Sequence, residues 1–310
     1  GPPRTVDGTL FVAALEMREG DEYPYPGALW LVAVNADGSV RTGARVEVAD
    51  AAGLVSIGPD GTAYLVAGNE ITAFDLDGAR DGWPVRVEGD LSALAFGPNG
   101  RIYLTSSPPD GTSLRLLAVE ADGRVVEAGP GDLPISGSSA WTGAGPAGGP
   151  IAPLVADDGT AYVVGEADGE TVVYGIDAAG AVMDGWPYRD PATLPWQGTC
   201  PPEALGCGVA RALPAVGSGG TLYLPVGAVG PVAGGSLVAL GRDGRVIPGW
   251  PVGLVRSGAD FWSVVAAPGE TAFALAIEPE TSRSTSATVL DIAIDRAVRY
   301  RETVVGPGGS

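Results

Sequence analysis

The sequence predicts an all-β fold of many short strands, and three observations lead to that class. Gly (49) and Pro (27) are abundant among the 310 residues, yet 45% of residues are hydrophobic, so the glycines are expected to end strands rather than to mark disorder. Asp-Gly and Asn-Gly pairs recur between short apolar runs, a pattern typical of tight hairpin turns because such turns require positive φ. Helical spacing of apolar residues is nearly absent.

One unit recurs along the chain with a length of about fifty residues, which is within the range of known repeat architectures. It contains an apolar run, a tight turn, a second run, a variable loop, a third run, a second turn and a last run. The clearest copy has runs at 54–57, 62–66 and 71–76, with turns at Asp60-Gly61 and Asp77-Gly78. Four strands per unit and six units predict a single β-propeller, and a pair of β-sandwiches is the alternative.

Each unit is assigned to one blade of a single domain covering residues 1–310. The expected blades span roughly 1–50, 51–88, 89–129, 151–188, 211–253 and 260–305, with long loops at 130–150 and 189–210. In the first unit only Pro2 to Val6 precede the first turn, so its inner strand is not evident. The last segment, 303–307, resembles the start of an inner strand and could close the ring. We assign 297–305 to the last outer strand instead, because too few residues separate it from the strand before.

Two segments carry a resemblance to a known family. Residues 238–244, Val-Ala-Leu-Gly-Arg-Asp-Gly, precede Gly-Trp-Pro-Val at 249–252, and residues 72–78 precede the same four residues at 82–85. This pattern resembles the repeat of quinoprotein-type, or PQQ-like, propellers. The resemblance implies a structural role for Trp83, Trp186 and Trp250, which would dock between neighbouring blades. The cofactor-using members are longer, with eight blades and a disulfide between neighbouring cysteines, so no quinone or other cofactor is expected here.

The charged residues exclude several classes of function. The net charge is −19, every one of the 18 cations is Arg, and the sequence contains neither His nor Lys. Without His there is no Ser-His-Asp or Cys-His catalysis, and without Lys there is no Schiff base or P-loop lysine. The negative charge disfavours nucleic acids and anionic membranes as partners. The same composition, which is also poor in Asn and Gln, is typical of a GC-rich bacterial genome.

Metal binding and membrane insertion are not expected either. Asp75, Asp77 and Asp81 are spaced as in a calcium loop but lack the closing bidentate Glu, so turn chemistry explains them better. No apolar run reaches the length of a membrane helix, and a monomer is expected. The first residues, Gly1-Pro2-Pro3, resemble a processed end, so a signal or an anchor is expected to have been removed.

The two cysteines indicate the compartment. Cys200 and Cys207 flank a short loop stiffened by two prolines, which predicts a disulfide and hence an extracellular or periplasmic location. The alternative is a pair of free thiols in a cytosolic loop.

Strand order separates the two ends of each blade. The first-to-second and third-to-fourth turns lie at one end, which we call the turn end, and the short Gly turns fall there. The second-to-third loops and the connections between blades lie at the other end, which we call the loop end. Long irregular segments fall on the loop end, at 16–27, 106–112, 129–150, 188–210 and 227–235. Binding groups concentrate on such loops when a rigid scaffold presents them.

The candidate ligand-binding residues therefore come from the loop end. They are aromatic and charged residues of the long loops and of the expected channel mouth: Tyr23, Tyr25, Trp141, Asp190, Trp196, Arg211, Asp260 and Trp262. For the loops of Tyr23 and Trp196 the alternative is a lid packed over the propeller mouth. For Arg211, placed near Asp90 and Asp260, we favour a neutralising ion pair, because buried charges need partners.

These observations predict a non-catalytic binding or sensor propeller, the ectodomain of a membrane-tethered bacterial protein that recognises a protein or a carbohydrate. No catalytic residue is assigned on this interpretation. One alternative is a carboxylate-dependent glycoside hydrolase or polysaccharide lyase, and another is a scaffold for envelope assembly. The carboxylates considered for the enzyme are Asp21, Glu22, Asp190, Glu203 and Asp260.

Overall fold

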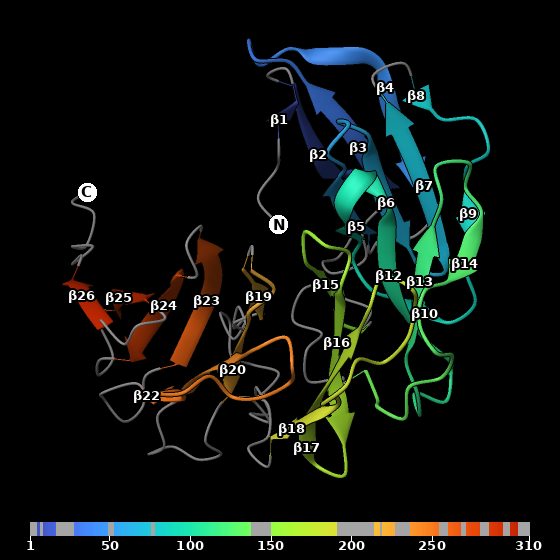
Figure 1. The fold of residues 1–310 in the computed structure, drawn as a ribbon. Coiled ribbons are helices and arrows are strands. Elements are labelled where there is room, and N and C mark those ends of the chain that lie inside the picture. The colour runs from blue at the N-terminus through green and yellow to red at the C-terminus, as the bar shows by residue number, and fades with distance from the viewer. Residues whose placement is uncertain are drawn as a thin grey trace. The chain divides into compact units, whose positions relative to one another are not determined.

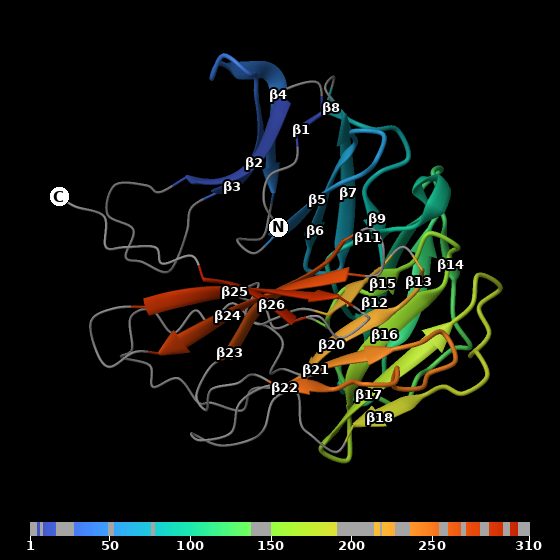
Figure 2. The same ribbon diagram turned by 60° about the vertical axis from the view of Figure 1, so that its left-hand side comes forward.

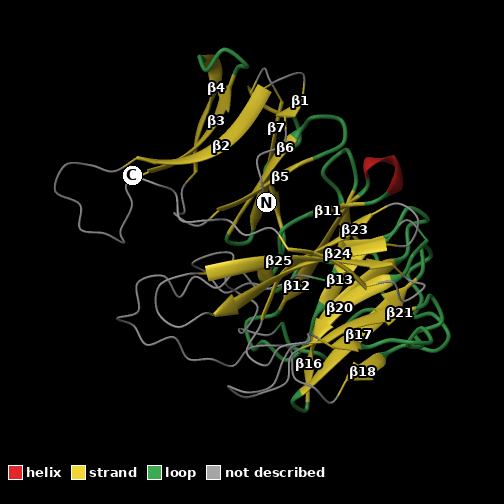
Figure 3. Cartoon of the chain, turned by 90° about the vertical axis from the view of Figure 1, so that its left-hand side faces the viewer, coloured by secondary structure: helices red, strands yellow, loops and turns green. Residues whose placement is uncertain are grey.

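The fold is known from a computed structural model of the chain, which divides into two compact units, residues 1–153 and 154–310. The described residues are 5–6, 9–16, 28–48, 53–75, 78–137, 150–190, 214–217, 219–226, 236–253, 260–267, 271–279, 285–293 and 298–302. Within these ranges the chain forms β-strands and a single short 3₁₀ turn, Pro98–Gly100 (Figure 3). The all-β expectation is confirmed. No helix in the described ranges is long and apolar enough to span a membrane.

The described part of the first unit contains three antiparallel sheets (Figure 1). The first is β1 (Thr5–Val6), β2 (Thr9–Glu16), β3 (Ala28–Val34) and β4 (Val40–Val48). The second is β5 (Gly53–Ile57), β6 (Ala63–Ala67), β7 (Glu70–Asp75), β8 (Gly78–Ala79) and β9 (Val85–Arg86). The third is β10 (Asp90–Leu91), β11 (Ala95–Phe96), β12 (Ile102–Ser107), β13 (Arg115–Val119) and β14 (Val125–Glu127).

The described part of the second unit contains three more antiparallel sheets (Figure 2). The fourth is β15 (Leu154–Val155), β16 (Ala161–Ala167), β17 (Glu170–Ile176) and β18 (Tyr188–Asp190). The fifth is β19 (Ala215–Val216), β20 (Leu222–Val226), β21 (Ser236–Leu240) and β22 (Val252–Gly253). The sixth is β23 (Asp260–Ala267), β24 (Thr271–Pro279), β25 (Thr285–Ala293) and β26 (Val298–Glu302).

The strands follow the expected repeat with three differences. A short inner strand, β1, does pair with β2 in the first sheet, where none was evident from the sequence. In the third sheet the inner strand expected at 91–96 is split into β10 and β11, which both pair with β12. Fully buried Ser92 lies at this split, and its Oγ accepts a hydrogen bond from the Thr105 N–H at 2.9 Å. The hydroxyl thus takes the place of a main-chain acceptor.

The third difference concerns the outer strands. In the second sheet the outer strand comes in two pieces, β8 and β9, both paired with β7. The fourth and fifth sheets have an isolated bridge in place of the first piece, Ile176–Val182 and Leu240–Val246, followed by β18 and β22. A Gly-Trp-Pro segment, 82–84, 185–187 or 249–251, lies between the two pieces each time.

Six Asp-Gly turns share one hydrogen-bond pattern, and they explain why the chain reverses where it does. In each, the Asp carboxylate accepts a hydrogen bond from the N–H two residues on, and the Gly has positive φ and donates its N–H to the carbonyl three residues back. In the turn at Asp60, for example, these bonds measure 3.1 Å from the Thr62 N–H and 3.0 Å to the Gly58 carbonyl. The six turns begin at Asp37, Asp60, Asp110, Asp122, Asp158 and Asp243.

Tight turns also occur at the loop end, which corrects the expectation that short Gly turns are confined to the turn end. β6 and β7 are joined by Gly68-Asn69, and β16 and β17 by Asp168-Gly169. Asp168 has φ +55° and Gly169 has φ +77°, as a two-residue hairpin turn requires. The long segments of the loop end therefore do not occur in every sheet.

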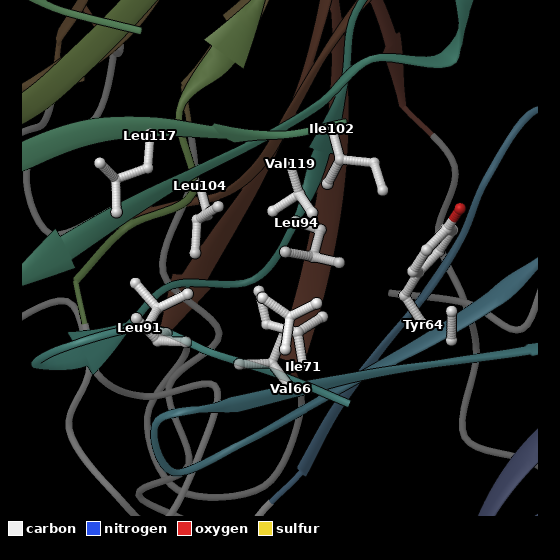
Figure 4. Close-up of a cluster of buried hydrophobic side chains, with 12 residues drawn as sticks. Tyr64, Val66, Ile71, Leu91, Leu94, Ile102, Leu104, Leu117 and Val119 are labelled. Carbon is white, nitrogen blue, oxygen red and sulfur yellow. The ribbon is translucent and has the colours of Figure 1, made fainter. Parts of the chain in front are cut away.

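A buried hydrophobic core lies between the second and third sheets (Figure 4). Val66 and Ile71 of the second sheet pack in one buried cluster with Leu91, Leu104 and Leu117 of the third. In the second unit, Tyr223 and Leu237 of the fifth sheet share a cluster with Val264 and Ala272 of the sixth. Burying each large aliphatic side chain contributes about 1.5–3 kcal/mol, so face-to-face packing of neighbouring sheets is the main stabilising term.

Candidate functional site

A set of side-chain contacts joins the turn ends of the fourth and fifth sheets. Trp186, which precedes β18, donates a hydrogen bond from Nε1 to the Arg242 carbonyl at 2.9 Å. Tyr162 on β16 donates its hydroxyl to the Gly220 carbonyl at 2.6 Å. The Arg242 guanidinium in turn binds the Asp158 carboxylate of the fourth sheet. Two neutral hydrogen bonds and one ion pair thus hold the two sheets together.

The aromatic part of this contact recurs in three sheets. The Trp of each Gly-Trp-Pro segment packs against a Tyr of the second strand in its own sheet, with ring centroids 5.3–5.8 Å apart. The pairs are Tyr64–Trp83, Tyr162–Trp186 and Tyr223–Trp250. Sequence reasoning found the tryptophans but missed their tyrosines. The signal was present as Gly-Thr-x-Tyr, which begins at Gly61, Gly159 and Gly220.

The glycines of these segments explain why the sheets approach so closely. A Cβ on Gly185 would lie 2.1 Å from the Asp243 carbonyl oxygen, and one on Gly244 would lie 2.5 Å from the Gly185 carbonyl oxygen. In the first unit a Cβ on Gly123 would lie 3.0 Å from the Gly82 carbonyl oxygen. The Gly before Trp therefore rests on the third-to-fourth turn of the following sheet in both described cases. The Trp–Pro bond that follows is cis in all three segments.

The ionisable groups of this contact are held in fixed charge states near neutral pH. Burial raises the pKa of Tyr162 to about 12, although the nearby Arg242 charge opposes the shift. Burial alone would raise the pKa of Asp158, but hydrogen bonds from Thr160 and the Arg242 charge outweigh it and the pKa is lowered. The phenol thus stays protonated and the carboxylate ionised. This chemistry suits a structural contact, since a general acid or base would need a pKa near the working pH.

Of the predicted ligand-binding residues, the structure describes three. Asp190, on β18, accepts a hydrogen bond from the Tyr188 hydroxyl at 2.7 Å. Burial and this bond raise the pKa of Tyr188. Asp260 and Trp262 lie on β23 of the sixth sheet, where Asp260 is opposite Ile277. Asp190 and Asp260 thus belong to different sheets of the second unit.

The remaining predicted site residues lie outside the described residues. They are the loop aromatics and Arg211, the two cysteines of the expected disulfide, and three carboxylates of the enzyme alternative: Tyr23, Tyr25, Trp141, Trp196, Arg211, Cys200, Cys207, Asp21, Glu22 and Glu203. Asp90, expected at the channel mouth, is exposed at the start of β10 and pairs with Ser107. Among the described residues no three acidic or cysteine side chains form a metal-binding group.

Sequence reasoning also missed a repeated ion pair beside the outer strands at the loop end. The pairs are Glu70–Arg86 at 3.1 Å, Arg115–Asp132 at 2.6 Å and Glu170–Arg189 at 3.3 Å. Each is substantially exposed, so solvent screens it and it contributes little to stability. Their repetition indicates a common edge structure in these sheets rather than a ligand site.

Comparison with known proteins gives a match at the level of solved structures. No protein-family model matches the sequence, and no protein of curated function does so either. Catalytically inactive virginiamycin B lyase from Staphylococcus aureus, crystallised with quinupristin, aligns with 98% of this chain and 88% of its own, at 12% identity and a TM-score of 0.53. A protein from Lactobacillus plantarum aligns with 96% of this chain and 82% of its own, at 14% identity and a TM-score of 0.54.

A third similar structure is a quinoprotein alcohol dehydrogenase-like protein from Bacteroides thetaiotaomicron. It aligns with 96% of this chain at 11% identity and a TM-score of 0.55, and this chain spans 64% of its length. Identities this low carry the fold and no activity. With its repeated antiparallel sheets and propeller proteins as structural neighbours, the chain is a β-propeller, while closure into a ring of six blades stays a prediction.

Proposed function

We propose that the chain is a non-catalytic binding propeller that recognises a protein or a carbohydrate through the loop ends of its blades. The supporting observation is the contrast between the two ends of the described sheets. At the turn end, Asp carboxylates cap their own turns, and main-chain carbonyls accept bonds from the neighbouring sheet. At the loop end, connections 17–27, 138–149, 191–213 and 227–235 are long and differ in sequence. A locked scaffold that carries variable loops is the usual arrangement of a binding protein.

Binding is favoured over catalysis by the chemistry of the chain. The inactive form of the lyase is a variant in which a histidine is replaced by alanine, and this chain has no histidine. The likeness to that enzyme therefore brings no lyase activity with it. Asp190, which the glycosidase alternative would use, is already hydrogen-bonded by Tyr188.

We further propose that the repeats belong to the quinoprotein-type family. The support is the Gly-Trp-Pro segment after the third strand of three sheets, together with the tyrosine that packs on its indole each time. The quinoprotein alcohol dehydrogenase-like structure is one of the similar folds. No cofactor is part of this proposal.

The test of binding uses a glycan array together with photo-crosslinking on intact bacterial cells. We expect Trp196→Ala and Tyr25→Ala to lose a defined interaction that the unmodified chain makes. The matched control is Arg124→Ala, because that side chain is exposed at a turn end. Loss of binding in the control, with the two loop variants unaffected, would reject the loop end as the site. Release of sugar product that Asp190→Asn abolishes would establish the enzyme alternative instead.

We also propose an extracytoplasmic location with a membrane tether, supported by the spacing of Cys200 and Cys207 and by the acidic composition. Protein purified from its native host is alkylated with and without prior reduction, and its intact mass is measured. We expect added mass only after reduction. Alkylation of both thiols without reduction would contradict the disulfide and the location that rests on it.

A further inference from the structure

One Asp-Gly turn in the described chain combines a carboxylate that has no partner with a glycine that packs against nothing. Asp168 and Gly169 form the two-residue turn between β16 and β17, and both are exposed. In the described residues the Asp168 carboxylate has neither a hydrogen-bond nor an ion-pair partner, and the Gly169 N–H donates to no main-chain carbonyl. A Cβ on Gly169 would meet no atom within 4 Å.

An Asp-Gly pair rearranges when the Gly nitrogen attacks the carboxyl carbon of the Asp. In the six turns with the shared hydrogen-bond pattern, the capped turns, both of these groups are held by hydrogen bonds. At Asp122, for instance, the carboxylate accepts the Arg124 N–H at 3.1 Å, and the Gly123 N–H donates to the Glu120 carbonyl at 2.9 Å. The same two bonds exist at the turns of Asp37, Asp60, Asp110, Asp158 and Asp243. Moving the carboxyl carbon towards the Gly nitrogen would break both bonds.

Two more Asp-Gly pairs precede tryptophan, and packing restrains them. Gly185 rests on the main chain of Asp243, with its would-be Cβ 2.1 Å from the carbonyl oxygen. Gly82 lies against Asp122, with the corresponding distance 3.4 Å. Each is followed by a Trp that packs on a buried Tyr, so the main chain there is fixed by the sheet contact.

We propose that Asp168 forms isoaspartate faster than any other Asp-Gly pair among the described residues. The Gly169 nitrogen attacks Cγ of the protonated Asp168 carboxyl, so that an N–Cγ bond forms and a Cγ–O bond breaks. One water leaves with the carboxyl oxygen and the amide proton, and a five-membered succinimide results. A water molecule then opens the ring at either carbonyl and yields aspartate or isoaspartate of unchanged mass. Water is the only co-reactant.

Relative to the six capped turns, the rate advantage follows from the hydrogen bonds that those turns must break; relative to Asp81 and Asp184 it follows from the packing of Gly82 and Gly185. A site that must first break a hydrogen bond to its ionised carboxylate forms the succinimide about tenfold more slowly, or slower still. Isoaspartate also adds one atom to the main chain of a two-residue turn. The pairing of Ala167 with Glu170, and the Glu170–Arg189 ion pair beside it, would then be displaced. The modification would therefore alter the loop end of the fourth sheet, and it is independent of the proposed binding function.

The experiment ages the full chain at 37 °C and neutral pH for several weeks. Peptides are mapped with electron-transfer fragmentation, which distinguishes isoaspartate from aspartate at each site. We expect isoaspartate at Asp168 to accumulate about tenfold faster than at the six capped turns, and also faster than at Asp81 and Asp184, which make up the other eight described Asp-Gly pairs. Equal or faster accumulation at any of the eight, or none at Asp168, would overturn the proposal.

Two controls separate structure from local sequence. In urea the capping hydrogen bonds are lost, so the rates at the nine sites should converge. If Asp168 keeps the same advantage in urea, its neighbours in sequence cause it and the structural argument is wrong. Asp168→Glu should remove the signal at this site, because a glutamate would need a six-membered ring that closes far more slowly.

Discussion

At the scale of single residues, Tyr162 links two sheets with one side chain. Its ring packs on Trp186 in its own sheet, while its hydroxyl donates to the Gly220 carbonyl of the next. Both groups are buried, so neither can exchange its partner for water. A buried carbonyl that loses its donor carries a desolvation cost.

We therefore expect Tyr162→Phe to lower the free energy of unfolding by about 1–3 kcal/mol, because the Gly220 carbonyl is left unsatisfied. Trp186→Ala should cost about 3–5 kcal/mol, since it also opens a cavity. Urea unfolding followed by fluorescence measures both. Tyr103→Phe is the control, because the Tyr103 hydroxyl makes only a 3.4 Å contact with Arg101. Equal losses in Tyr162→Phe and Tyr103→Phe would show that the bond to Gly220 contributes nothing.

The same tyrosine predicts a loss of stability in alkali. An unfolded tyrosine ionises near pH 10, whereas burial raises the pKa of Tyr162 to about 12. The folded state thus keeps a proton that the unfolded state has lost, and stability falls as the pH rises between these values. Unfolding midpoints from pH 8 upward should decline less steeply in Tyr162→Phe than in the unmodified chain. Parallel declines would contradict the shifted pKa, and a tyrosinate absorbance titration checks it directly.

At the scale of elements, the apolar runs predict most strands, and the exceptions have identifiable causes. The run from Leu91 to Phe96 is continuous in sequence, but the Ser92 hydroxyl replaces a main-chain acceptor and splits the strand. The outer strands break at Gly-Trp-Pro because Pro has no N–H to donate to a ladder. The Asp168-Gly169 hairpin carried a standard turn signal that went unused, since the repeat pattern placed a longer loop there.

The segment after the third sheet gives a prediction about an element. Leu133 and Ile135 are buried, and Leu133 forms a bridge with Leu114. Gly137 then lies beside Pro150, because a Cβ on Gly137 would be 3.0 Å from the Pro150 Cβ. The two ends of segment 138–149 are therefore adjacent in space. Two residues can span the gap between them.

Replacing residues 138–149 with Gly-Gly should leave the free energy of unfolding within about 0.5 kcal/mol of the original, since a shorter loop costs little to close. Leu133→Ala, just before that segment, should cost about 2–5 kcal/mol because it leaves a cavity. Chemical unfolding of the two variants provides the comparison. A large loss in the loop replacement would mean that residues 138–149 are part of the packed core.

At the scale of the whole molecule, the repeat was sufficient to predict a β-propeller, because turn chemistry and strand spacing recur along the chain. The ligand site could not be predicted in the same way. Loops such as those of Tyr23 and Trp196 occur once, and no second copy indicates which residues meet. Asp190 was proposed as a ligand-binding residue from its chemical type and its position on a long loop. In the structure its carboxylate accepts a hydrogen bond from the Tyr188 hydroxyl. A periodic sequence thus specifies the scaffold far better than the parts that the scaffold carries.

The charge of the chain also predicts its response to salt. With a net charge of −19, the folded state repels itself, and the unfolded chain relieves that repulsion by expanding. Raising NaCl to about 0.15 M shortens the screening length to about 8 Å, so the thermal midpoint should rise. KCl at the same concentration should give an equal shift. A midpoint that falls with salt would indicate that attractive ion pairs such as Arg242–Asp158 outweigh the repulsion.

The contact between the Gly-Trp-Pro segment and the following sheet has a direction, and the direction has an evolutionary consequence. In both described cases the segment of one sheet rests on the third-to-fourth turn of the next, never the reverse. A gene segment that encodes one such unit therefore encodes the Gly-Trp-Pro segment for the contact on one side and the third-to-fourth turn for the contact on the other. When a whole unit is duplicated in tandem, each new pair of neighbouring units already has both contact surfaces. Duplication of only part of a unit leaves one of these surfaces without its partner. Propellers of this type can thus change their number of blades by copying whole units in frame.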